Sequence, residues 1–136
     1  MIFKTLYGKD RRLSKASNYR IDWDGSSRSK FQKRIKDILR PFWVNHIVFE
    51  ELPVVGTKLS LDFYNANLNV AIEVQGQQHY RHVEFFHGKS KLKYLQQIKR
   101  DLDKIKYCEI NDIFFFEIYD DSDISKLIER LKGGDF

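Results

Sequence analysis

Three short apolar segments follow one another in the first half of the chain, and they constrain the fold more than any other feature. They span residues 44–51, 58–64 and 70–75, and β-branched or aromatic residues alternate with polar ones along them. Alternation of this kind is typical of strands. Pro53 and Gly56 separate the first two segments, and the turn-forming residues 65–69 separate the second from the third. The spacing therefore predicts a meander of three strands.

Segments with helical periodicity surround this meander. Apolar residues recur at helical spacing from Ser27 to Pro41, where the proline predicts the end of the helix. A longer helix is expected from Ser90 to about Cys108, then a strand over residues 113–119 and a short helix that ends at residues 133–134. The chain is thus predicted to be an α/β protein of order αβββαβα, with a mixed sheet flanked by helices. The apolar stripe that should turn the long helix toward the core consists of Leu92, Leu95, Ile98, Leu102 and Ile105.

Charge is distributed unevenly along the 136 residues, a length suited to one domain. Residues 1–26 are basic and rich in Ser, Asn and Gly, which predicts an irregular N-terminal arm before a single domain over residues 27–136. The net charge of +5 conceals basic blocks at residues 1–46 and 89–106 and acidic blocks at residues 47–88 and 107–136. A basic balance favours anionic partners without identifying them, and an excess this mild is as often a solvated surface as a nucleic-acid footprint.

Cysteine content and hydropathy bear on the compartment. Cys108 is the single cysteine, so it forms no internal disulfide and belongs to no cysteine cluster for zinc. Residues 1–6 are too short an apolar stretch for a signal sequence, and no later run reaches the length of a membrane span. These features predict an intracellular protein of a reducing cytoplasm.

Two carboxylates are expected on one face of the meander. Period-two alternation turns Leu61 and Phe63 toward the core, and therefore leaves Asp62 on the other face, together with Glu73 and Gln75 of the next strand. A turn centred near residue 67 would bring Asp62 opposite or diagonal to Glu73. Facing carboxylates destabilise a sheet unless a cation lies between them, and Mg²⁺ prefers oxygen ligands. The alternative is that both are unrelated, solvated residues on an open sheet face.

A longer pattern surrounds these carboxylates. It comprises Leu61–Tyr64, Leu68–Gly76, Gln78–Tyr80, Phe85–Phe86, Gln97, Arg100–Asp101, Lys104, Tyr107–Cys108, Asn111 and Ile113–Ile118. Over residues 27–118 the chain resembles the PD-(D/E)XK nuclease superfamily, in the branch of very-short-patch repair endonucleases and of phage and intron-encoded homing endonucleases. The resemblance implies a restriction-endonuclease-like core and a metal-dependent DNA endonuclease. It also implies that the enzyme can be encoded by a phage and act in a bacterial host. Asp62, Glu73 and Gln75 would hold Mg²⁺, which Mn²⁺ can replace.

The chain departs from the superfamily pattern at two positions. Gln75 stands where the motif ends in a lysine, and a neutral amide cannot supply that positive charge to a transition state. Lys58 or Lys104 can supply it instead. Gln32 stands where the first helix of the superfamily often carries a glutamate, so a third carboxylate is either missing or replaced by Glu51.

The segment between the third strand and the long helix adds a candidate base. The resemblance implies that His79 acts as a general base or hydrates a metal, whereas an isolated loop histidine is usually a surface residue. His82 and His87 have weaker claims, and no fourth ligand for zinc accompanies the three. Phe85 and Phe86 are expected to plug the core rather than wedge between bases.

Cationic residues are expected to hold DNA. Arg100 and Lys104 share a helix face with Gln97 and would approach the scissile phosphate, although an isolated helix would carry such residues as a solvated face. Residues that would contact the backbone elsewhere are Arg11, Arg12, Lys15, Lys30, Lys33 and Arg34. Two rival functions remain open, a catalytically degenerate DNA-binding protein or assembly partner on this scaffold and a nuclease directed at RNA. A homodimer would suit an enzyme that cuts both strands.

Overall fold

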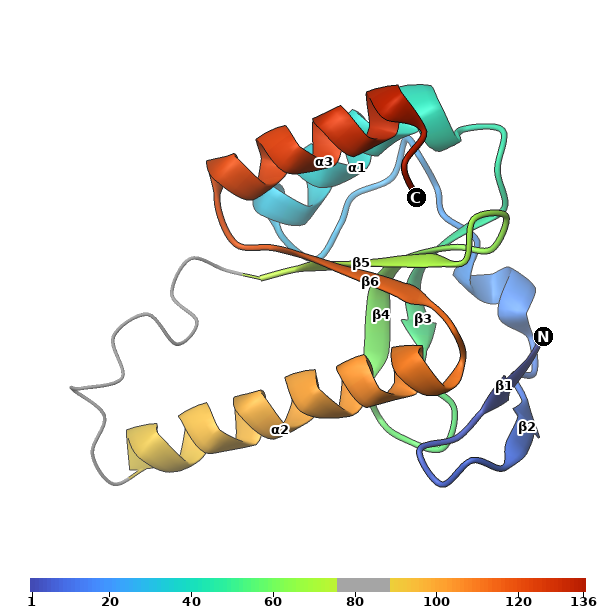
Figure 1. Ribbon diagram of the computed structural model, residues 1–136, viewed down its shortest axis with the longest axis vertical. Coiled ribbons are helices and arrows are strands. Elements are labelled where there is room, and N and C mark those ends of the chain that lie inside the picture. The colour runs from blue at the N-terminus through green and yellow to red at the C-terminus, as the bar shows by residue number, and fades with distance from the viewer. Residues whose placement is uncertain (76–88) are drawn as a thin grey trace.

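The computed structural model describes residues 1–75 and 89–136 and is built around one four-stranded sheet (Figure 1). The strand order is β3-β4-β5-β6, in which β3, β4 and β5 are antiparallel neighbours and β6 runs parallel to β5. The predicted meander and the predicted mixed sheet are therefore confirmed. The strands are β3 (Val48–Pro53), β4 (Ser60–Asn65), β5 (Val70–Val74) and β6 (Phe114–Ile118).

Helices cover both faces of this sheet. α1 (Lys30–Trp43) and α3 (Asp121–Gly133) lie together on one face, and α2 (Lys89–Ile110) lies on the other (Figure 1). Each face has its own apolar cluster, which includes Leu39, Phe63 and Leu127 on the first face and Tyr64 and Tyr107 on the second. The protein is thus an α/β protein, because both faces of the mixed sheet are buried beneath helices.

The first helix begins and ends later than the sequence predicts, since it starts at Lys30 rather than at Ser27. The Ser29 hydroxyl accepts a hydrogen bond from the Gln32 amide, which caps the helix at its N-terminus. The predicted end at Pro41 is wrong, because the helix continues to Trp43. Pro41 lies in the exposed last turn, where the loss of one backbone hydrogen bond costs least. Trp43 is 1% exposed, so burial of its ring stabilises the extra residues of the helix.

The N-terminal segment is structured, so the prediction of an irregular arm is wrong. It contains β1 (Ile2–Lys4), β2 (Asp10–Arg12) and a 3-10 helix, η1 (Ala16–Tyr19), and β1 pairs with β2. Phe3 and Leu13 are buried in the same cluster as Tyr64. Strands of three residues are too short for alternation to reveal them in a sequence, and their packing on the sheet stabilises them instead.

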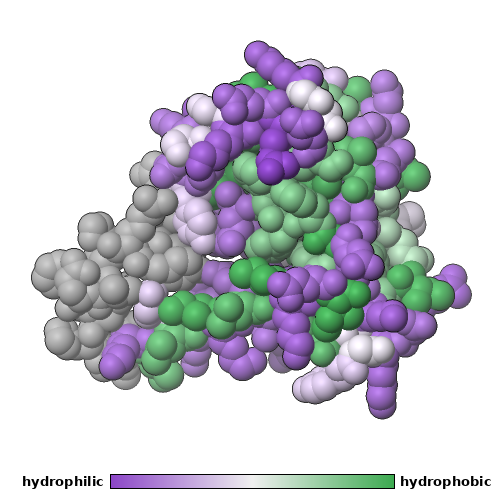
Figure 2. Space-filling view, viewed as in Figure 1, coloured by the Kyte–Doolittle hydropathy of each residue, from purple (hydrophilic) through white to green (hydrophobic). Residues whose placement is uncertain are grey.

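The apolar stripe of α2 does not face the core as predicted. Leu92, Leu95 and Leu102 are 57%, 49% and 58% exposed, and Figure 2 shows apolar side chains along this helix at the surface. Asp101 and Tyr107 are turned inward instead. The first turns of α2 extend past the sheet in Figure 1, so among the described residues it is the second half of the helix that packs against the sheet. None of the described helices has the length and apolar character that crossing a membrane requires.

Candidate functional site

The ladder between β4 and β5 changes character at Asp62 and Glu73. Its last backbone pair is Phe63 with Ile72, and one step further the two carboxylate residues face each other. There side chains replace the backbone acceptors. The Asp62 amide donates to Glu73 Oε2 at 2.6 Å, and the Val74 amide donates to Asp62 Oδ2 at 2.8 Å. The predicted juxtaposition is confirmed, but the alternative of two solvated residues is wrong, because each residue is 1% exposed.

Two cationic side chains compensate this buried pair. Lys104 of α2 places its Nζ 2.5 Å from Glu73 Oε1, and Arg28 places its Nη2 3.0 Å from Asp62 Oδ1. The Lys104 side chain is 14% exposed, whereas that of Arg28 is 60% exposed. Every carboxylate oxygen of the pair therefore accepts from one named donor, and only one of these donors lies mostly in solvent.

Burial dominates the electrostatics of the pair. It raises the pKa of Asp62 above its ordinary value, and together with the neighbouring Asp62 charge it raises the pKa of Glu73 to about 8. Burial by itself would lower the pKa of Lys104, but the adjacent Glu73 carboxylate outweighs it and the pKa of Lys104 is raised. Two carboxylates with raised pKa values favour the approach of further positive charge.

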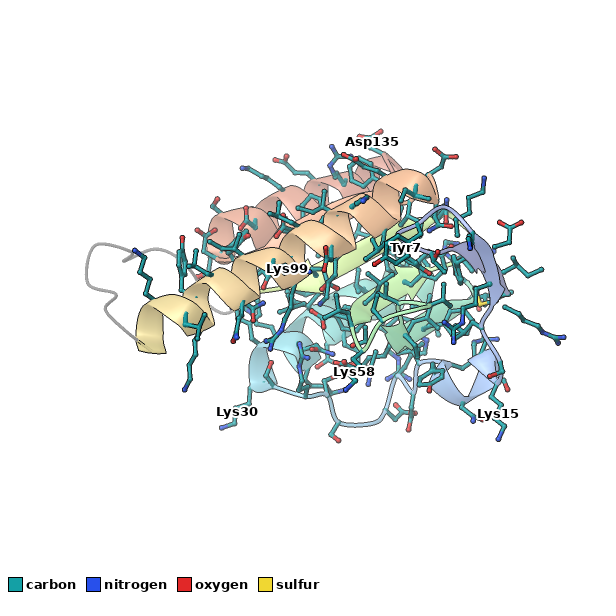
Figure 3. The ribbon with its side chains drawn as sticks, turned by 90° about the horizontal axis from the view of Figure 1, so that it is seen from below. Tyr7, Lys15, Lys30, Lys58, Lys99 and Asp135 are labelled. Carbon is teal, nitrogen blue, oxygen red and sulfur yellow. The ribbon has the colours of Figure 1, made fainter. Side chains whose placement is uncertain are left out.

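A cleft of about 620 Å³ opens onto these carboxylates. Cationic side chains from three parts of the fold line the cleft. They belong to the residue before the Ser29 cap of α1, to the turn before β4, and to α2. In Figure 3 Lys58 lies between Lys30 and Lys15, on the same side of the molecule as both. An acidic floor beneath a basic rim suits a ligand that combines a cation with an anion. The lining residues that carry this chemistry are Arg28, Lys58, Asp62, Glu73, Gln75, Arg100 and Lys104.

Gln75 lies beside the carboxylates but is held from below. Its backbone N–H donates to the Ile118 carbonyl at 2.8 Å, and its side-chain Nε2 donates to Glu117 Oε2 at 3.4 Å. It is 6% exposed and still contributes to the cleft lining. Nearby, burial raises the pKa of Asp101 to about 6, and Gln97 donates to this carboxylate at 3.1 Å. The cleft floor is thus a connected polar layer.

A second polar layer lies behind Arg28. Gln32 Nε2 donates to Glu50 Oε2 at 2.9 Å and to Glu51 Oε1 at 3.1 Å. Two successive strand residues reach the same amide because Glu51 has a φ of +56°, which interrupts the alternation of β3. Glu51 Oε2 also lies 3.8 Å from Arg28 Nη1. Gln32 therefore supports this layer, and Glu51 reaches the Asp62 site through Arg28.

The other residues predicted to bind DNA are dispersed. Arg100 lines the cleft, whereas Lys33 and Arg34 already form ion pairs with Asp37 and Asp121 at 3.0 and 3.2 Å. Lys30 is exposed in the first turn of α1. Arg11, Arg12 and Lys15 are exposed on the N-terminal segment. Residues 76–88 lie outside the described ranges, and they include the predicted residues His79, Tyr80, His82, Phe85, Phe86 and His87.

Sequence reasoning missed Arg28. It directly precedes the Ser29 cap of α1, so its backbone is outside the helix and its side chain is free to reach the sheet. The available signal was a basic residue at the start of a helix that packs over the carboxylate strands, and such a signal is weak without the fold. Within residues 1–75 and 89–136, no group of three or more His, Cys, Asp or Glu side chains forms a metal-holding cluster.

Comparisons with known proteins found two viral relatives. The chain is 35% identical over 80 residues to "Uncharacterized protein 094L" of Frog virus 3 (isolate Goorha), a match that covers 58% of this chain and 52% of that protein. It is 30% identical over 78 residues to "Uncharacterized protein 033L" of Invertebrate iridescent virus 3, which covers 57% of this chain and 40% of that protein. The matches thus span about half the length of these curated relatives. No family of known proteins and no solved structure matches the chain.

Proposed function

We propose that the protein is a Mg²⁺-dependent DNA endonuclease that hydrolyses phosphodiester bonds. The observation that carries this proposal is the pair Asp62 and Glu73, buried face to face on adjacent strands at the floor of a cleft whose rim is cationic. Carboxylates of this kind bind a divalent cation, and cations at the rim bind phosphate.

The donor set fits Mg²⁺. Hard oxygen ligands are present, and Mg²⁺ is commonly bound through one or two carboxylates while it keeps several waters. Asp62 and Glu73 would hold it, with the oxygen atoms of Gln75 as further candidates. Mn²⁺ accepts the same ligands and should replace it. When bound, such an ion lowers the pKa of water and neutralises charge on a phosphoryl group. The buried carboxylates favour the ion because it relieves their mutual repulsion.

Lys104 is the residue best placed to supply the charge that Gln75 lacks. Its ammonium group comes from α2 rather than from β5, yet it lies 2.5 Å from Glu73 and at the cleft lining. A cation held there stabilises negative charge that develops on a transferred phosphoryl group. Lys58 and Arg100 are both exposed, and the hydrogen bond from Arg100 to Gln97 is long, at 3.4 Å. Both side chains can therefore turn toward a phosphate. Lys104 would thus act in the chemistry, and Lys58 and Arg100 in binding.

The element order supports the restriction-endonuclease-like core that the sequence resemblance implies. α1, β3, β4, β5, α2, β6 and α3 follow one another as αβββαβα, and the carboxylates stand on the two central strands. On this view His79, which lies outside the described residues, would serve as a base. DNA would lie across the cleft, and Arg11, Arg12, Lys15 and Lys30 would contact its backbone outside the site.

Cleavage of supercoiled plasmid and of a four-way junction tests this proposal. We expect cleavage with Mg²⁺ or Mn²⁺, none with EDTA, and a loss of at least ~10²-fold in Asp62→Asn and Glu73→Gln. Glu129→Gln is the matched control, because Glu129 is an exposed carboxylate on α3, across the sheet from the cleft. Cleavage in EDTA, or by Asp62→Asn at the wild-type rate, would contradict the assignment.

Gln32 and Gln75 also support the rival reading of a degenerate DNA-binding scaffold or assembly partner. Both stand where the superfamily carries a charged side chain. Tight DNA binding without cleavage, and without heat on titration with Mg²⁺ or Mn²⁺, would favour this rival. Comparison of DNA with RNA of the same sequence separates the two nuclease substrates.

A further inference from the structure

Arg28 links the buried carboxylates to solvent. Its guanidinium donates to Asp62 Oδ1 at 3.0 Å while 60% of its side chain is exposed, whereas the Asp62 side chain is 2% exposed. Its other terminal nitrogen lies 3.8 Å from Glu51 Oε2. The arginine therefore pairs with a buried carboxylate from a position that is itself largely solvated.

Among the described residues, four donors bind the carboxylate pair, and they differ in how readily they can be displaced. Two are backbone amides, those of Asp62 and Val74, and the strands fix them in place. Lys104 is a third, held at 14% exposure between α2 and the sheet. Arg28 is the one that is largely solvated, and exposed ion pairs contribute little to stability. Asp62 Oδ1 is accordingly the oxygen that can change its partner at the lowest cost.

We propose that Arg28 is an exchangeable counter-ion, which yields Asp62 Oδ1 to the divalent cation and then pairs with a substrate phosphate. The inference rests on the proposed function and extends it to a residue that the superfamily motif does not include. A guanidinium and a dication compete for one oxygen because both are positive and repel each other at contact distance. After the exchange, the planar fork of Arg28 suits a phosphate, which it can bind through two parallel hydrogen bonds. Arg28 already lines the cleft beside Lys58.

Calorimetric titration of the full chain with Mn²⁺ tests the competition directly. Arg28→Gln removes the competitor, so we expect Mn²⁺ to bind about 3- to 10-fold more tightly than to the wild type. Arg40→Gln is the matched control, because Arg40 is 44% exposed and pairs with Asp24 at 2.7 Å elsewhere on the surface. Its Mn²⁺ affinity should equal that of the wild type. Circular dichroism confirms folding, and Arg28→Met is a second variant with the same expected gain.

DNA affinity provides the second readout, measured with Ca²⁺ in place of Mg²⁺ to limit cleavage. If the cation releases Arg28 toward phosphate, Ca²⁺ should raise the DNA affinity of the wild type. In Arg28→Gln this increase should be at least about threefold smaller, because the released donor is missing. A residue that merely supported the fold would move both affinities in the same direction.

The outcomes separate the two proposals. Mn²⁺ affinity that is unchanged or weaker in folded Arg28→Gln and Arg28→Met would overturn the role of Arg28 and leave the metal site standing. A wild-type chain that binds no Mn²⁺, or that binds it equally well after Asp62→Asn, would overturn the proposed function itself.

Discussion

Asp62 and Glu73 are ordinary carboxylates in the sequence and unusual ones in the fold. Burial, and for Glu73 the neighbouring charge as well, raises both pKa values, to about 8 for Glu73. Folding removes these two carboxylates from water, and the loss of their hydration destabilises the folded state. Lys104 and Arg28 offset part of the cost through direct contacts. At the residue scale the site is therefore strained electrostatically, which is common where a ligand supplies the missing charge.

Stability should respond to pH through Glu73. Because its folded pKa of about 8 exceeds its ordinary value of 4.5, the folded chain holds a proton that the unfolded chain has lost in this window. The wild type should therefore lose about 1–3 kcal/mol of unfolding free energy between pH 5 and pH 8, relative to Glu73→Gln. Urea unfolding across this range measures the difference, with Glu129→Gln as a control that keeps the wild-type slope. Parallel slopes in the wild type and Glu73→Gln would contradict the expectation.

Lys104 should matter for chemistry more than for binding of the cation. Lys104→Met keeps the side-chain length and removes the charge beside Glu73, so cleavage should fall about 10²- to 10³-fold while Mn²⁺ still binds. Lys99→Met is a control on the same helix, since Lys99 is 78% exposed and pairs with Asp103. Single-turnover cleavage together with Mn²⁺ calorimetry checks both halves. Equal activity of the two variants would remove Lys104 from the proposed mechanism.

At the scale of elements, α2 shows how tertiary packing overrides a local pattern. Its leucines have helical spacing, yet the residues that meet the sheet are Asp101, Lys104, Tyr107 and Cys108. Tyr107 is 1% exposed and packs in the cluster of the second sheet face. Burial also raises the pKa of the Cys108 thiol to about 12, so this cysteine is an inert packing residue rather than a nucleophile.

The two sides of α2 should differ sharply in stability measurements. Leu102→Ala should change the unfolding free energy by less than about 0.5 kcal/mol, because the side chain is 58% exposed. Tyr107→Ala should cost about 3–5 kcal/mol, since it empties a fully buried aromatic position. Urea unfolding of both variants decides the matter. A large loss from Leu102→Ala alone would mean that the predicted stripe faces the core after all.

For the whole molecule, the sheet separates two environments. One side carries α1 and α3 over the apolar cluster of Leu39, Phe63 and Leu127, beside which Gln32 and Lys36 of α1 are buried against Glu50. On the other side, the cleft opens next to α2 at Asp62 of β4 and Glu73 of β5. The basic blocks of the sequence meet the acidic block at this cleft, through Arg28 from the first and Arg100 and Lys104 from the second. The net charge of +5 is therefore less informative than its placement.

The salt dependence of DNA binding should report this placement. Lys58→Gln and Arg100→Gln should each lower the slope of log affinity against log salt by about 1, because each removes one phosphate contact. Lys126→Gln is the control, as Lys126 is exposed on α3 across the sheet from the cleft. Binding to a non-cleavable duplex in Ca²⁺ at several salt concentrations measures the slopes. A larger effect from Lys126 would place the DNA on the other face.

The sequence by itself determined the order of the elements from α1 onward and the meeting of Asp62 with Glu73, but it did not reveal β1, β2 and η1. Both depend on local periodicity and on a short turn, and the register of neighbouring strands then carries Asp62 opposite a residue 11 positions away. Only the tertiary structure decided that the pair is buried, that α2 turns Lys104 toward it, and that Arg28 covers it. These contacts join residues 31 and 34 positions apart on separate elements, and they depend on which face each element buries. That choice is made by packing of the whole chain, which no local pattern encodes.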